Sequence, residues 1–147
     1  MSEISVISNQ YNTMVATSDR INNSVIAFKK KSLLQDHQNR SQYPKLAVSS
    51  EEMEAAKETL LAFLLSVRSL LKGEQVQSDF IPSLIVNDYK RKLVGTVYLE
   101  EDLDDILVRL QNGQVVDENA IAVLDNLLSL LDKERNALFR KLRRARG

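Results

Sequence analysis

An uncharged heptad stripe runs through the first thirty-five residues of this chain of 147 residues. Apolar or small residues recur there in a three-then-four spacing, and an α-helix places such residues along one seam that faces another helix. The stripe consists of Ile4, Ile7, Tyr11, Met14, Ser18, Ile21, Val25, Phe28, Ser32 and Gln35. From Ser5 to Ser18 there is no charged residue, because Ser, Asn, Gln and Thr occupy the other faces. A helix of this composition is predicted to be covered by other helices.

The few chain breakers favour an all-α fold. Four glycines and two prolines accompany abundant leucine, which indicates helices with short connections rather than a turn-rich β protein. We expect a bundle of about five helices with long N- and C-terminal helices. Residues 1–39 form the heptad-patterned helix, 40–48 a connector, and 49–147 a helical bundle that ends in a basic helix.

The expected helix ends follow from capping residues. Ser49 and Glu52 have the spacing of a capping box, and Gly73 follows the last leucine of the helix that this box begins. Asp117 is expected to cap the last helix, which continues to about Ala145.

The region between these two helices is open to two interpretations. We expect a third helix from Asp79 to Val94, ended by Gly95, and a fourth helix capped by Thr96. A short β-hairpin over residues 84–99 is the alternative, because the apolar runs there also have the composition of strands.

The terminal helices are long for a compact chain. At 1.5 Å per residue they reach roughly 42 to 54 Å, against a radius of gyration of roughly 15 Å for a compact chain of this length. Part of each helix is therefore expected to project or to pack against a second subunit.

Composition argues against several functional classes. Lys and Arg number 20 and Asp and Glu number 20, so no global field attracts nucleic acid or an anionic membrane. The absence of cysteine excludes disulfides, thiolate zinc sites and a cysteine nucleophile. His37, the single histidine, has no candidate catalytic partner. We expect a cytoplasmic, non-enzymatic protein with no cofactor, no bound metal, no small-molecule substrate and no membrane span.

The heptad seam is the favoured protein interface. The positions on either side of the seam carry few of the Glu and Lys residues that pair across a two-stranded coiled coil. This composition disfavours a two-stranded coiled coil and favours packing among several helices. The function expected is a structural or adaptor subunit of a homo- or hetero-oligomeric assembly, with itself or another helical protein as partner. The alternative is that the seam packs lengthwise on the chain's own bundle. The interface residues would be Ile4, Ile7, Tyr11, Met14, Ile21, Val25 and Phe28.

The C-terminal run is the one concentrated positive charge. In the second functional hypothesis these cations contact the phosphates of a nucleic acid, making the chain an accessory nucleic-acid-binding subunit. The residues concerned are Arg140, Lys141, Arg143, Arg144 and Arg146. Cations at a helix C-terminus also complement the helix dipole, and the acidic block at residues 100–105 offers a partner within one chain or between neighbours.

Overall fold

The computed structural model describes residues 3–36, 48–75, 78–114 and 117–147, which form five α-helices and no strand. The helices are α1 (Glu3–Asp36), α2 (Ser50–Leu71), α3 (Val86–Val94), α4 (Leu99–Gln111) and α5 (Glu118–Ala145). The all-α prediction with long terminal helices is confirmed. The expected connector lies outside the described residues except for Val48, as do the side chains of Ser32 and Gln35.

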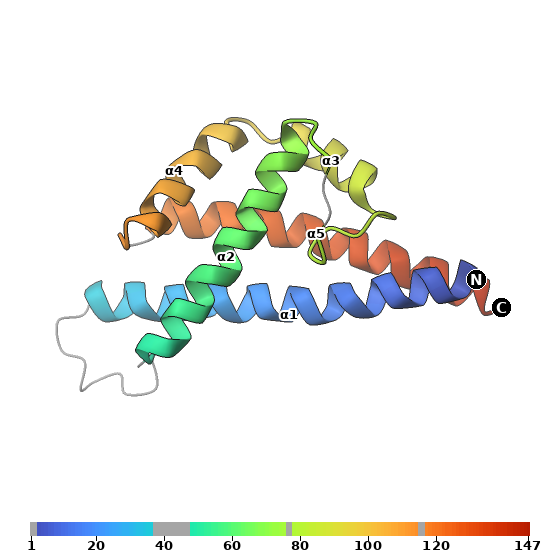
Figure 1. Ribbon diagram of the computed structural model, residues 1–147, viewed down its shortest axis with the longest axis horizontal. Helices are drawn as coiled ribbons and strands as arrows, with labels where there is room; N and C mark the ends of the chain where they lie inside the picture. Colours follow the sequence, from blue (N-terminus) through green and yellow to red (C-terminus); the bar gives the residue numbers. More distant parts are fainter. Residues whose placement is uncertain (1–2, 37–47, 76–77, 115–116) are drawn as a thin grey trace.

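The two long helices form the base of the bundle. In Figure 1, α1 and α5 run antiparallel along the long axis, and the two chain termini meet at one end. The central helix α2 crosses them, and α3 and α4 pack against α2 and α5 on the side away from α1. The middle of each long helix is therefore covered within the chain.

A single apolar core joins all five helices. Met14 of α1, Leu60 of α2, Leu93 of α3, Leu103 of α4 and Leu124 of α5 have no exposed surface. Each buried leucine-sized side chain contributes about 1.5 to 3 kcal/mol relative to an exposed one. The fold thus depends on contacts between helices distant in sequence.

Side-chain caps begin α2 and α5 as predicted. The Ser49 hydroxyl accepts a hydrogen bond from the backbone N–H of Glu52 at 3.1 Å, and a carboxylate oxygen of Asp117 accepts one from the N–H of Ala120 at 2.9 Å. The Asp117 carboxylate also accepts a 2.8 Å hydrogen bond from Arg109. The Ala120 N–H first, and then the Arg109 guanidinium, lower the pKa of Asp117 against the opposing effect of burial.

Glycines in the left-handed region end α2 and α4. Gly73 has φ 76° and Gly113 has φ 68°, a conformation that costs glycine little. The N–H of Glu74 returns to the carbonyl of Ser69 at 3.0 Å, which completes the hydrogen bonding expected at such a helix end. The prediction that α2 stops at Gly73 is confirmed.

The predicted start of the third helix was wrong. Asp79 does not cap it, and α3 begins only at Val86. Before it, the side chain of Gln10 from α1 accepts a hydrogen bond from the N–H of Leu84 at 3.0 Å and donates one to the hydroxyl of Ser83 at 2.9 Å. These tertiary contacts satisfy backbone that the sequence pattern assigns to a helix.

The hairpin alternative and the Thr96 cap are also overturned. Residues 84–99 contain a turn, α3 and the connection to α4, with no strand. Gly95 ends α3 as expected, but the N-cap of α4 is Tyr98. The sequence pattern therefore located the break between the helices correctly and misplaced the start of α4.

Candidate functional site

The heptad seam lies inside the chain's own bundle. Five of its seven predicted interface residues are buried against the same chain, Tyr11 is half-buried, and Ile4 is 36% exposed. The buried residues are Ile7, Met14, Ile21, Val25 and Phe28. The seam thus follows the intramolecular alternative, because α2 and α5 occupy the face that a partner would need.

The predicted phosphate-binding residues lie at the C-terminal end of α5. All five cations are exposed, and among the described residues none of them forms an ion pair. The guanidinium of Arg143 lies 5.9 Å from the ring centre of Phe139, which is itself 5.6 Å from the ring of Tyr11. We call Phe139 and the cations after it the basic end.

The acidic block on α4 lies away from the basic end. Asp104 pairs with Arg68 at 2.8 Å, and Asp105 pairs with Arg109 at 3.2 Å. Glu100 and Glu101 are exposed, without an ion pair within the described chain. Figure 1 places α4 beside the first half of α5, at the opposite end from the chain termini. Pairing of block and basic end within one chain is therefore excluded in this fold.

An exposed apolar surface lies where α3 meets α4. Val94, Val97 and Tyr98 are 66%, 71% and 72% exposed, the largest values among the large apolar side chains of the described residues. We call residues 94–98 the α3–α4 corner. Beside them a cleft of about 510 Å³ is lined by apolar residues of α2, α3 and α4, with carboxylates from the first turn of α4. Its lining consists of Leu71, Leu93, Val94, Thr96, Tyr98, Leu99, Glu100 and Glu101.

Tyr98 adopts a backbone conformation that is costly for an L-residue. Its φ of 61° and ψ of 19° lie in the left-handed helical region, and it is the one non-glycine residue with positive φ among those described. This conformation costs roughly 1 to 2 kcal/mol. The combination of a costly backbone conformation and an exposed aromatic side chain makes Tyr98 the centre of a candidate functional site.

Sequence reasoning missed the α3–α4 corner. Val97 and Tyr98 follow Gly95-Thr96 directly, and their apolar character was attributed to a helix or a strand with a buried side. The available signal was a pair of large apolar residues separated from a helix-ending glycine by a single threonine. Their exposure follows from the position of α4, which the sequence does not specify.

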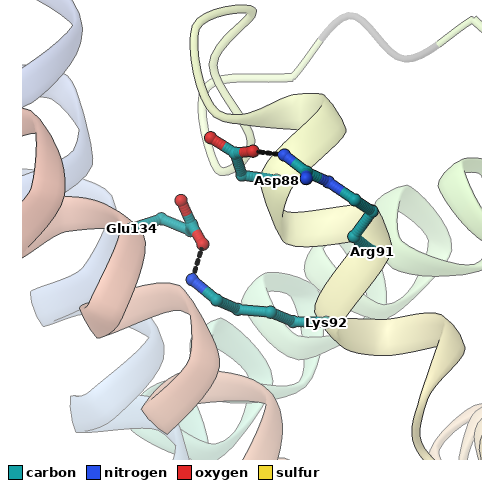
Figure 2. A network of polar contacts seen from close by, with 4 residues as sticks. All are labelled: Asp88, Arg91, Lys92 and Glu134. Carbon is teal, nitrogen blue, oxygen red and sulfur yellow. Dashed lines mark hydrogen bonds and ion pairs between the residues drawn. The ribbon is translucent and has the colours of Figure 1, made fainter.

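An ion pair between a half-exposed lysine of α3 and a buried glutamate of α5 joins these two helices. Figure 2 shows the ammonium of Lys92 at the carboxylate of Glu134, and the adjacent pair between Asp88 and Arg91 within α3. The Glu134 side chain is only 3% exposed, so Lys92 provides the charge compensation that burial requires. Arg91 and Lys92, two of the three cations at residues 90–92, thus form ion pairs within the chain.

Tyr89 completes this polar contact between α3 and α5. Its buried hydroxyl donates a hydrogen bond to the carbonyl of Leu127 at 3.0 Å. Burial, followed by the negative charge of Glu134, raises the pKa of Tyr89 well above its ordinary value. Together these contacts fix the helix that leads into the α3–α4 corner.

The described residues contain no group of three or more His, Asp or Glu side chains placed to hold a metal ion. None of the described helices is long and apolar enough to cross a membrane. Comparison with protein-family models, with curated proteins and with solved structures finds no match to this chain.

Proposed function

We propose that this chain is a non-enzymatic structural or adaptor subunit that binds protein through the α3–α4 corner. The cytoplasmic setting expected from its composition is part of this proposal. The observation that supports it is a left-handed, 72% exposed tyrosine next to two exposed valines and a cleft of mixed apolar and polar lining. Aromatic residues at the centre of an apolar patch supply much of the binding energy in protein interfaces.

The surroundings of the patch fit a protein partner better than a small substrate. Carboxylates of the first turn of α4 border one side of the cleft, as the polar rim of an interface borders its apolar centre. The cleft lining includes the hydroxyls of Thr96 and Tyr98 and the carboxylates of Glu100 and Glu101, but both carboxylates are exposed and no hydrogen bond in the described chain holds either of them against a hydroxyl. These groups are therefore not arranged as the oriented acid, base and nucleophile of a catalytic site.

A photo-crosslinking residue at position 97 tests this proposal. We expect it, in cells that express the chain, to form covalent adducts with protein, because a partner covers this position. The matched control is position 108, also a valine, which is 52% exposed and lies roughly 14 Å farther along α4. Adducts that are equally abundant at 97 and 108, or missing from both, would refute the proposal.

Nucleic acid is the second candidate partner, and the unpaired cations of the basic end favour it. If they contact phosphates, an electrophoretic mobility shift should be strong at low salt and weaken steeply as salt increases. Reversing Arg143 and Arg144 to glutamate should abolish the shift. A chain that leaves DNA and RNA unshifted at low salt is not a nucleic-acid-binding subunit.

A further inference from the structure

We propose that the partner of the α3–α4 corner is a second copy of this chain, whose basic end docks there. This inference rests on the proposed function, since it assigns a partner to the same surface. It concerns two regions on one molecule that carry complementary chemistry and that the fold keeps apart (Figure 1).

The charges of the two regions are complementary. The corner presents Glu100 and Glu101 beside its cleft, both exposed and both without an ion pair within the described chain. Arg68 and Arg109 pair with Asp104 and Asp105 farther along α4. The five cations of the basic end are exposed and likewise unpaired. Such opposed patches steer two proteins toward one another and fix their orientation.

The apolar surfaces are complementary as well. Phe139 is 44% exposed and lies among the cations of the basic end, with Arg143 over its ring. Across the interface, Val94, Val97 and Tyr98 offer exposed apolar area beside the cleft. An aromatic ring from one copy against the tyrosine and valines of another gives the apolar centre that a purely ionic contact lacks.

The position of the two regions determines the type of assembly. The corner lies near the C-terminal end of α2, whereas the basic end lies where the chain termini meet (Figure 1). Two different surfaces then meet at each contact, so the interface is heterologous. Such contacts propagate into open chains unless the rotation between copies closes a ring.

Light scattering on the purified chain tests the assembly directly. We expect masses that exceed 16.7 kDa and increase with protein concentration at about 0.01 M salt, where the Debye length is about 30 Å. At about 1 M salt, where it is about 3 Å, the mass should fall toward that of one chain. A single-chain mass at every concentration and at both salt levels would overturn the inference.

Two variants separate the two halves of the interface. Val97→Ser at the corner, and Arg143→Glu with Arg144→Glu at the basic end, should each weaken association at least about tenfold. The matched controls are Val108→Ser on α4, and Lys30→Glu with Lys31→Glu on α1. Each control makes the same change of side chain away from its target region and should leave association unchanged. Thermal unfolding followed by circular dichroism verifies that each variant folds.

Mixing the two defective variants gives the sharpest outcome. The corner variant retains an intact basic end, and the basic-end variant retains an intact corner, so an equal mixture should form dimers and nothing larger. A mixture that stays monomeric while the wild type assembles would contradict the head-to-tail geometry.

The crosslinker at position 97 distinguishes the two proposals. In the purified chain it should join two copies, with the linked peptide from residues 139–147. Adducts in cells that contain only other proteins would refute self-docking and leave the proposed function standing. The absence of any adduct specific to position 97 would refute both proposals.

Discussion

Tyr89 shows how one buried residue makes the stability of the bundle depend on pH. Its ring is fully buried, its hydroxyl bonds to a carbonyl of α5, and burial raises its pKa. In the unfolded chain the phenol ionises at about pH 10. Above that pH the folded state retains a proton that the unfolded state loses, so the contribution of Tyr89 to stability declines as pH increases.

Replacement of Tyr89 by phenylalanine should remove this dependence. Above pH 10 the wild type should lose about 1.4 kcal/mol of unfolding free energy per pH unit more than Tyr89→Phe. Near neutral pH the variant should be less stable by about 1 kcal/mol, because the hydrogen bond to Leu127 is lost. Urea unfolding of both proteins from pH 7 to 11 measures this difference, and parallel curves would contradict it.

At the scale of elements, the ends of the helices were more predictable from the sequence than the packing partners of each helix. The caps at Ser49 and Asp117 and the stop at Gly73 depend on local geometry, which the sequence specifies. The start of α3 was mispredicted because Gln10, distant in sequence, satisfies the backbone there. Ile7, Met14, Ile21, Val25 and Phe28 of the heptad stripe are buried, but an apolar stripe does not show whether the helices that cover it belong to the same chain.

Substitutions in α1 test the intramolecular packing of its seam. Met14→Ala should reduce the free energy of unfolding by about 3 kcal/mol, because it opens a cavity in the core. Ile26→Ala should change it by less than about 0.5 kcal/mol, since Ile26 is 46% exposed. Chemical denaturation at several protein concentrations measures both effects. If the Met14 effect grew as the protein was diluted, the seam would belong to an intermolecular contact instead.

At the scale of the whole molecule, the α3–α4 corner combines a costly backbone conformation with exposed apolar side chains. Tyr98 bears a left-handed backbone conformation while its side chain makes few contacts within the chain. The core helices hold it there, since α3 is fixed to α5 and α4 is packed by its leucines. If Tyr98 serves the fold, replacing it should reduce stability. If it serves binding, a replacement that relieves the backbone strain should increase stability.

Tyr98→Gly should increase stability and reduce association together. Glycine adopts positive φ without a steric cost, so the free energy of unfolding should increase by about 1 kcal/mol. Loss of the exposed ring should weaken self-association about tenfold. Thermal unfolding and light scattering on one preparation measure both. A variant that is less stable, or that associates as well as the wild type, would show that the tyrosine serves the fold.

By itself, the sequence determined the helical class, most helix ends and the residues able to form a core, because periodicity and capping act over a few residues. Only the tertiary structure decided that α1 is covered by its own chain, that the acidic block lies far from the basic end, and that Val97 and Tyr98 stay exposed. Each of these depends on how helices separated by many residues pack together. That packing is decided by the summed burial of side chains from all five helices, which no local pattern specifies.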